Sequence, residues 1–440
     1  MRVCAVKRRA RVAVVGAGWA GLAAAANLAD NADVVLFEAG RTAGGRARTV
    51  ASRNGFSFLD NGQHLLLGAY HGVFDLLRRV GAETAHRREA MNWQMHGGMK
   101  LHTAPLPAPL HLLWGVLFAR NLPAHRKYGL LRHMRALRHW HKNGLPDQTV
   151  GEWLRARQVC AASVAQFWQP LVLAALNTPV QTASLRVLAN VLADGVWRKR
   201  GDSDFCLPNR DLGAFFVEPV LRYLVAHGGE FVPQCRIGRL RRDDDGAYRL
   251  AGRTFDAAVL AVAPQHLAAL LPEALFAPHA DTFAAMRHHA ITTVYLRYRE
   301  RVRLPAVMTG VSDGTAHWLI DRSRLNGANE IAAVISVSEQ YGIDAPGQWY
   351  ERVCADVRRV CPQLGEAVAH QVITEKRATV AAEAGRVLPD VSAWRAQGLY
   401  AAGDWLHPRY PATLEAAVQS GSEAARQCLH DWGVRADAAF

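Results

Sequence analysis

An α/β fold with two domains is the architecture that the sequence predicts, and three observations lead to it. Residues 11–15, 16–21, 22–28 and 33–37 have in turn the patterns of a buried strand, a glycine turn, an alanine-rich helix and a second buried strand, which together form a βαβ unit. Strand-like segments recur over 291–380, and most of them alternate at least partly, as half-buried antiparallel strands do. The chain has 440 residues, of which 50% are hydrophobic, and this length suits two or three domains.

The glycine turn predicts a Rossmann-type dinucleotide site. It has the spacing GxGxxG between a strand and a helix, and Glu38 follows the second strand, which is the context that the motif requires. Gly16 permits the turn, Gly18 lets a pyrophosphate approach the backbone, and Gly21 lets helix and strand close. The pyrophosphate then lies at the helix N-terminus. Glu38 can accept both ribose hydroxyls and repels a 2′-phosphate, so NADP is disfavoured.

The rest of the chain predicts further helices and strands but no flexible linker. Residues 230–264 suggest a hairpin, with its turn at 243–246, that leads to a fully buried strand. Because no linker is evident, we expect interleaved domains. The other expected elements are helices over 110–140 and 147–200, strands over 291–302, 316–325, 329–339 and 370–380 with a helix at 349–360 among them, a short strand over 398–405 and a helix over 412–429.

Segments near both ends of the chain resemble flavoproteins of the amine oxidase and carotenoid desaturase type. They are GGR at 44–46, and AGDW at 402–405 followed by ATLEAA at 412–417. The resemblance implies that GGR passes beside the pyrophosphate and that Asp404 binds the flavin side of the cofactor. It also implies that the last helix points its N-terminus at the isoalloxazine ring and stabilises the anionic reduced flavin. The implied cofactor is FAD, bound by Gly16, Gly18, Gly21, Glu38, Gly45, Arg46, Asn61, Gly62, Ile237, Asp404, Thr413 and Leu414.

Four longer runs narrow the resemblance. They are DNGQHLLLGAY at 60–70, WQPLVLAALNTP at 168–179, EKRAT at 375–379 and AGDW…YPATLEAAVQSG within 402–421. These runs resemble the squalene-associated FAD-dependent desaturases, or hydroxysqualene dehydroxylases, of hopanoid biosynthesis. The likeness implies that an allylic C30 alcohol loses its hydroxyl while reduced FAD supplies a hydride, giving squalene. The ten-residue lead before the first strand departs from the family and touches no functional motif.

The implied division of the chain follows the amine-oxidase type of fold. The FAD-binding domain comprises 1–75, 205–265 and 395–440, and the substrate domain, a mixed sheet plus helices, comprises 76–204 and 266–394. Hydride delivery to an allylic cation also requires dry walls rich in aromatic residues. Aromatic candidates, each of which also suits a structural core, are Trp93, Trp114, Trp140, Trp168, Trp197, Tyr295 and Trp318.

The proton donor for the departing water is not identified by any motif. His64 lies in the DNGQH run, and Tyr410 precedes the last helix. Both are candidates, and a structural role suits each equally well. No metal site is expected, because the seven cysteines form no CxxC pair, a usage that also disfavours disulfides and suits a reducing compartment.

The net charge of +14 is concentrated in a stretch without acids. Residues 90–146 contain no Asp or Glu. Their cations are Lys100, Arg120, Arg126, Lys127, Arg132, Arg135, Arg138 and Lys142. We interpret about 100–142 as a basic amphipathic helical lid on an anionic membrane, because a C30 hydrocarbon costs about 0.8 kcal/mol per CH₂ to expose to water. A solvated helical face is the alternative, and no nucleic-acid-binding motif is present.

These features predict a cytoplasmic protein that lies on the inner face of the membrane. No window reaches 18 uninterrupted apolar residues and no targeting signal is visible, so no membrane span is expected. The electron donor and the direction of hydride transfer stay open. Alternatives are an oxidative desaturase of a carotenoid-like polyene, a non-catalytic lipid carrier like the Rab GDP-dissociation inhibitors, and, less favoured because cationic amines are repelled, an amine oxidase.

Overall fold

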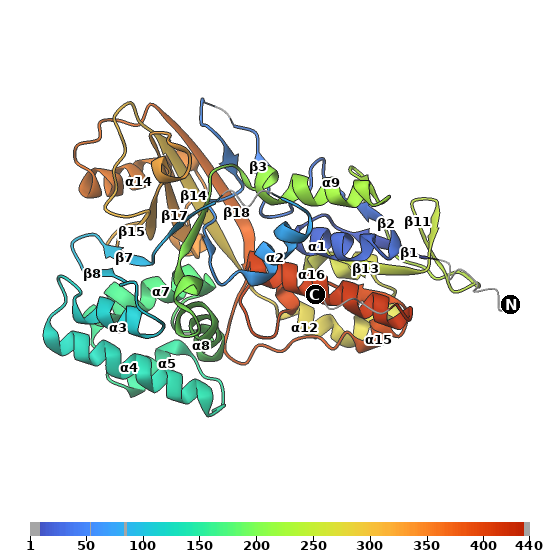
Figure 1. The fold of residues 1–440 in the computed structure, drawn as a ribbon, viewed down its shortest axis with the longest axis horizontal. Coiled ribbons are helices and arrows are strands. Elements are labelled where there is room, and N and C mark those ends of the chain that lie inside the picture. The colour runs from blue at the N-terminus through green and yellow to red at the C-terminus, as the bar shows by residue number, and fades with distance from the viewer. Residues whose placement is uncertain (1–8, 53, 83–85, 435–440) are drawn as a thin grey trace.

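Two sheets and a cluster of helices make up the molecule, which is a computed structural model describing residues 9–52, 54–82 and 86–434. In Figure 1 a parallel sheet lies on the right, a larger mixed sheet at the upper left and the helical cluster below it. The ten-residue lead lies almost wholly outside the described residues. The architecture is therefore of the expected α/β class.

The parallel sheet carries the glycine turn and is assembled from distant parts of the chain. Its strand order is β10-β2-β1-β13-β19, and every pairing is parallel. The strands are β1 (Ala10–Val15), β2 (Ala32–Phe37), β10 (Glu230–Val232), β13 (Ala257–Leu260) and β19 (Leu399–Ala401). The two strands expected first are present, and ligands of such sheets bind at the carboxyl ends of the strands.

The first and last long helices pack against each other beside this sheet (Figure 1). Every residue of α1 (Trp19–Ala29) is buried, as its alanine-rich sequence permits. In α16 (Leu414–Asp431), a Cβ at Gly421 would lie 2.0 Å from the carbonyl oxygen of Ala20, so only glycine allows this approach. Asn27 also donates a hydrogen bond of 2.9 Å to Ser422. The C-terminal helix is thereby fixed on the first helix.

The mixed sheet separates two hydrophobic cores. Its strand order is β18-β14-β17-β16-β15-β7-β8. Along β14 (His288–Arg297), Val294 faces the core under α14 (Pro346–Val360), while the next residue, Tyr295, faces the core shared with the helical cluster. This period of two confirms the strand pattern. The other strands are β7 (Asn92–Met95), β8 (Lys100–His102), β15 (Met308–Gly310), β16 (Trp318–Asp321), β17 (Glu330–Ser336) and β18 (Ala369–Val380).

The helical cluster is more broken than its sequence pattern indicates. The single stretch expected over 110–140 forms α3 (Leu110–Leu117) and α4 (Ala124–Lys142), with Pro123 immediately before α4. Proline favours a helix start but restricts the residue before it to extended backbone. The stretch 147–200 forms α5 (Val150–Ala156), α6 (Ala161–Ser163), a π-helical turn at Val164–Trp168, α7 (Gln169–Leu176), α8 (Leu185–Leu192) and a second π-helical turn at Ala193–Trp197.

One expectation about local structure is wrong. The lid expected over 100–142 is helical only from Leu110, because Lys100–His102 form β8, in which buried Leu101 alternates with more exposed polar neighbours. The turn expected at 243–246 is present, because the Gly246 N–H donates to the Asp243 carbonyl at 2.9 Å and Arg242 and Tyr248 form an antiparallel bridge across it. A second turn, at 251–252, joins β11 (Tyr248–Leu250) to β12 (Arg253–Phe255) in an antiparallel hairpin. Ala251 and Gly252 both have positive φ, as the tight hairpin turn requires.

Several short strands give no sequence signal and were not expected. They are β3 (Thr49–Val50), β4 (Leu59–Asp60), β5 (Leu66–Leu67), β6 (His86–Glu89) and β9 (Phe205–Pro208). The division of the chain into two domains at the expected residue bounds stays a prediction. Among the described residues, no helix is both long and apolar enough to cross a membrane.

Candidate active site

A cavity of about 1790 Å³ connects the glycine turn to the helical cluster. Pockets for a single drug-sized ligand are typically about 300–1,000 Å³, so this volume suits two ligands. The residues expected to bind the cofactor all line the cavity except Gly21. His64 and Tyr410 line it as well.

The three glycines of the turn differ in what surrounds them. Gly16 has a φ of +103°, and a Cβ there would lie 2.5 Å from the carbonyl oxygen of Ala261. A Cβ at Gly21 would lie 1.8 Å from the carbonyl oxygen of Gly16, so Gly21 serves the close packing of helix and turn. At Gly18 the nearest atom to a Cβ would be Gly45 Cα at 4.0 Å. The backbone of Gly18 therefore faces open cavity.

Glu38 is held at the end of β2 by backbone groups. Its carboxylate accepts hydrogen bonds from the N–H of Ala17 at 2.9 Å and of Gly40 at 2.7 Å. Each carboxylate oxygen keeps a second lone pair for a ligand. The Cys235 N–H donates to the Glu38 carbonyl at 2.8 Å, and Ile237 lines the same end of the cavity.

Arg46 joins the GGR segment to the C-terminal motif. Its guanidinium donates to both carboxylate oxygens of Asp404, at 2.6 and 2.7 Å, and to the carbonyl oxygen of Ala378 at 2.8 Å. The Asp404 side chain is buried, whereas that of Arg46 is partly exposed. The two halves of the FAD signature therefore meet at one wall of the cavity.

The DNGQH segment forms a tight turn on the next part of the wall. The Asn61 side chain donates to the Arg46 carbonyl at 3.1 Å and to Glu375 at 2.9 Å, and Gly62 has a φ of +107°. His64 Nδ1 lies 3.0 Å from the Gly62 carbonyl oxygen. Desolvation, aided by the charge of Arg46, lowers the pKa of His64 to about 4. The ring is therefore neutral at pH 7, and because a carbonyl only accepts, Nδ1 carries the proton and Nε2 accepts.

The N-terminus of α16 also lies at the cavity. Thr413 caps the helix by accepting a hydrogen bond of 3.1 Å from the Ala416 N–H, and Thr413 and Leu414 line the wall. Glu415 accepts hydrogen bonds from the N–H groups of Gly72 and Val73, at 2.8 and 3.0 Å. These bonds tie α16 to α2 (His71–Arg79) and fix where the helix begins.

Tyr410 is hydrogen-bonded to an acid that the sequence does not single out. Its hydroxyl donates to Asp194 at 2.7 Å, and Arg409 donates to the same oxygen at 2.8 Å. The Tyr410 ring stacks on His407 with centroids 4.6 Å apart. Burial and the bond to Asp194 raise the pKa of Tyr410 to about 12. Asp194 lies in the second π-helical turn and lines the cavity, and π-helical turns are frequent at functional sites.

Apolar side chains predominate at the far end of the cavity, which Arg135 and Arg138 of α4 also line. Its lining includes Leu112, Leu113 and Val116 of α3, Leu130, Leu131 and Met134 of α4, and Trp318 and Ile320 of β16. Of the expected aromatic residues, Trp93, Trp197 and Trp318 line the cavity. Trp140, Trp168 and Tyr295 are buried in the core instead, and Trp114 is on the surface.

The polar end of the cavity fits FAD. The N-termini of α1 and α16 both lie at it, and helix N-termini present free N–H groups to anions. Glu38 offers acceptors for a ribose, and the open space before Gly18 admits a pyrophosphate. No group of three or more His, Cys, Asp or Glu side chains suited to a metal ion occurs in the described part of the chain.

Comparison with known proteins agrees with this geometry. The model of the flavin containing amine oxidoreductase family matches residues 19–429. Hydroxysqualene dehydroxylase of Zymomonas mobilis is 28% identical, over 94% of this chain and 98% of that protein. The enzyme of the same name from Rhodopseudomonas palustris is also 28% identical, over 94% and 97%. The structure of cyclohexylamine oxidase from Brevibacterium oxydans superposes with a TM-score of 0.71, covering 96% of this chain and 99% of that one at 16% identity.

These likenesses confirm the expected fold and cofactor. The resemblance to hydroxysqualene dehydroxylases extends over nearly the whole chain, and the solved structure shares the fold. The chain belongs to the flavin containing amine oxidoreductase family and is an FAD-dependent oxidoreductase.

Proposed function

We propose that the protein removes the hydroxyl group of hydroxysqualene reductively and releases squalene. The observation that carries the proposal is one continuous cavity whose polar end fits FAD and whose other end is lined mainly by apolar side chains. A cavity of about 1790 Å³ suits the cofactor together with a large hydrocarbon. The full-length likeness to hydroxysqualene dehydroxylases supports this choice of substrate.

The overall reaction breaks the allylic C–O bond, forms a C–H bond and releases the oxygen as water. It therefore consumes one hydride and one proton, and reduced FAD, when bound, supplies the hydride. A two-electron donor must then restore the reduced cofactor after each turnover. The residues of the chain have three tasks, which are to orient the alcohol, to exclude water and to deliver the proton.

The apolar wall orients the hydrocarbon and excludes water. Trp93 and Trp318 pack edge to face on it, with ring centroids 5.2 Å apart. Aromatic faces stabilise a nearby positive charge, so these rings suit the allylic cation that forms as the C–O bond breaks. Water excluded from the same wall cannot trap that cation.

Tyr410 is the better proton donor of the two candidates. His64 offers only the acceptor Nε2 to a ligand at neutral pH, because its pKa is lowered to about 4. Tyr410 keeps its proton at neutral pH, and its hydroxyl is held by Asp194, which also accepts a hydrogen bond from Arg409. Donation to the leaving oxygen requires the Tyr410 hydroxyl to turn away from Asp194.

An anionic membrane surface is the proposed source of the substrate. On α3, Leu113 lines the cavity and is 39% exposed. Its neighbours Trp114, Leu117 and Phe118 are 46%, 49% and 62% exposed. Such a contiguous apolar surface is unusual on a protein with no partner. Hydrocarbon therefore has a short path between the cavity and any lipid that covers α3.

The basic residues of α4 complement this apolar face. Arg135 and Arg138 line the cavity beside it, and Lys127 donates a hydrogen bond of 2.7 Å to the carbonyl of Leu117 at the end of α3. Each Lys or Arg near an anionic bilayer contributes about 1 kcal/mol to binding. Together the two helices support peripheral attachment to the membrane, with α3 inserted and α4 at the headgroups.

The decisive experiment is product analysis by mass spectrometry. Purified holoenzyme, reduced chemically, is incubated with hydroxysqualene, and squalene is expected to accumulate in proportion to the reduced flavin consumed. The oxidised holoenzyme with the same substrate and free reduced FAD without protein are the controls. If the reduced enzyme leaves hydroxysqualene intact, or the oxidised enzyme desaturates a polyene instead, the proposal is wrong.

A further inference from the structure

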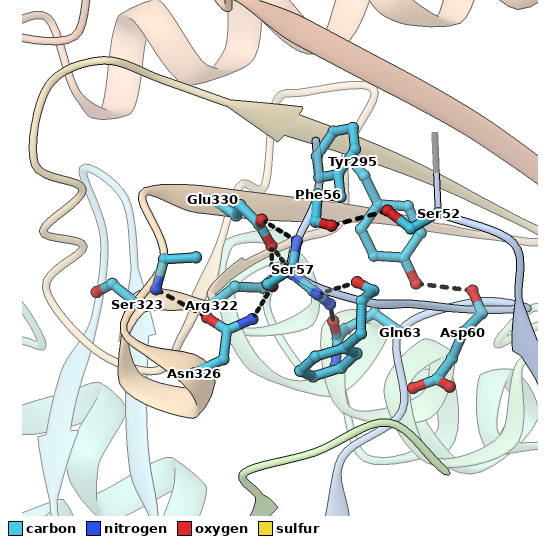
Figure 2. A network of polar contacts seen from close by, with 12 residues as sticks. Ser52, Phe56, Ser57, Asp60, Gln63, Tyr295, Arg322, Ser323, Asn326 and Glu330 are labelled. Carbon is cyan, nitrogen blue, oxygen red and sulfur yellow. Dashed lines mark hydrogen bonds and ion pairs between the residues drawn. The ribbon is translucent and has the colours of Figure 1, made fainter. Parts of the chain in front are cut away.

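A buried arginine lies directly behind the DNGQH turn. Arg322, between β16 and α13 (Ser323–Asn326), is 0% exposed. Its three guanidinium nitrogens donate to three different acceptors, namely Glu330 at 2.9 Å, the side-chain oxygen of Gln63 at 2.6 Å and the carbonyl of Phe58 at 2.6 Å. Figure 2 shows Arg322 at the centre of this network.

Aromatic residues hold the guanidinium in place. Its central carbon lies 4.6 Å from the ring centroid of Phe58 and 5.1 Å from that of Tyr295. The Tyr295 hydroxyl in turn donates to the carbonyl of Asp60 at 3.1 Å (Figure 2). The segment from Phe58 to Gln63 is therefore bonded twice to Arg322 and once to Tyr295 of β14. Asn61 and Gln63 add bonds to Glu375 of β18 and Thr293 of β14.

The Gln63 side chain carries this attachment to the cavity. Its oxygen accepts from Arg322, so its amide nitrogen is left to donate to the carbonyl of His64 at 3.1 Å. Gln63 and His64 line the cavity, whereas Arg322 does not. Arg322 can therefore affect a ligand only through the turn.

The energetic cost of burying the Arg322–Glu330 ion pair indicates that Arg322 has a geometric role rather than a stabilising one. Burial of two charges costs several kcal/mol, and an apolar replacement is often neutral or more stable. A lysine would pair with Glu330 equally well but lacks the planar fork that reaches three acceptors. The specific contribution of Arg322 is thus the direction of its hydrogen bonds.

We propose that Arg322 is a positioning residue for the flavin cofactor, which fixes the turn of Asn61–His64 against FAD through the side chain of Gln63. This inference deepens the proposed function and rests on its placement of FAD beside the turn. It does not depend on the identity of the substrate.

The test compares FAD binding in three variants without substrate. Arg322→Lys keeps the charge opposite Glu330 and loses the fork, and Gln63→Met removes the link to the turn. Both are expected to weaken FAD binding about tenfold, the effect of losing one hydrogen bond to a charged group, and to change the visible circular dichroism of bound flavin. Ser57→Ala is the matched control, because Ser57 Oγ bonds Glu330 and Asn326 but neither Arg322 nor Gln63.

The double variant distinguishes positioning from general destabilisation. If Arg322 acts through Gln63, the combined change in FAD affinity is no larger than that of either single variant. FAD affinities and flavin spectra equal to those of Ser57→Ala in both single variants would overturn the proposal. If Arg322→Lys does not fold, Gln63→Met against Ser57→Ala still decides it. Since no substrate is present, failure of the hydroxysqualene assay leaves this result unaffected.

Discussion

One guanidinium nitrogen of Arg46 donates to both carboxylate oxygens of Asp404, although 358 residues separate the two in the chain. The pair joins the GGR segment to the AGDW motif, which follows strand β19, at the cavity wall where FAD is expected. Both side chains are therefore in position to contact the bound cofactor.

Removal of the Asp404 carboxylate is expected to release the flavin. Asp404→Ala leaves Arg46 without its carboxylate partner and removes the acid expected at the flavin side, so FAD affinity should fall at least about tenfold. The measurement is the visible flavin absorbance of protein purified in parallel with wild type. Asp33→Ala, which removes a surface pair with Arg9 at 3.6 Å, is the control and should keep its flavin. A fully flavinated Asp404→Ala protein would contradict the assignment.

Two glycine variants should separate binding from folding. In Gly18→Ala the new Cβ projects into open cavity, so we expect an unchanged melting temperature but weaker FAD binding. In Gly21→Ala the new Cβ lies 1.8 Å from a carbonyl oxygen, so unfolding should become easier by about 1–3 kcal/mol or more. Calorimetry of the apoprotein and FAD titration measure the two effects. Equal melting temperatures for the two variants would refute the interpretation that Gly18 serves cofactor binding and Gly21 serves packing.

Protein stability should fall as pH rises from about 4 to 7 because of Asp60. Burial, and secondarily the neighbouring Asp211, raise the Asp60 pKa from its ordinary 3.8 to about 7. The folded state therefore favours the protonated acid, and its stabilising effect, complete below pH 4, is lost as pH approaches 7. Asp60→Asn, always neutral, should be more stable than wild type at pH 8 by up to about 4 kcal/mol. Urea unfolding of both proteins at pH 4 and pH 8 measures the effect. If the free energy of unfolding changes with pH in the same way in Asp60→Asn and in wild type, the prediction is wrong.

The apolar face of α3 should govern vesicle binding. Leu117→Ser combined with Phe118→Ser is expected to reduce co-sedimentation with anionic phosphatidylglycerol vesicles about tenfold or more, because each side chain loses its transfer into lipid. Turnover of detergent-dispersed substrate should not change. The matched control replaces the exposed Val225 and Val387 by serine. Equal binding by the two double variants would rule α3 out.

The two proton-donor candidates should respond differently. Tyr410→Phe removes the only transferable proton of the pair at neutral pH, so kcat should fall about 10²- to 10⁴-fold. His64→Gln keeps an acceptor and should change kcat much less. The flavin spectrum of each variant controls for cofactor loss. A normal kcat in Tyr410→Phe would exclude Tyr410 as the donor.

The sequence predicts those parts of the fold that are determined by patterns within a short stretch of residues. The βαβ unit, Glu38 and four of the seven strands of the mixed sheet, β14, β16, β17 and β18, follow from residue periodicity and glycine spacing. The FAD signature needed only two recognisable segments. The helix break at Pro123 was missed because apolar residues continue with helical spacing on both sides. Strand β8 was missed because its three residues lie within a stretch where positive charge was the dominant signal.

The residues that the sequence could not identify act through tertiary contacts. Asp194 is an isolated acid in a mostly apolar helical stretch. No residue near it in the sequence indicates that it accepts a hydrogen bond from Tyr410. Arg322 is one arginine among many in a basic chain, and only its burial distinguishes it. The roles of Asp194 and Arg322 are apparent only in the folded structure, where segments more than 200 residues apart in the chain are in contact.

The order of strands in the parallel sheet has a consequence for how the enzyme matures in the cell. β19 and α16 follow the other strands of this sheet in the chain, so the flavin pocket lacks the wall they form until residues 399–431 have been synthesised. Acquisition of the coenzyme is therefore expected to require the chain through α16. A nascent chain arrested before residue 399 should carry none, however well its first strands have formed.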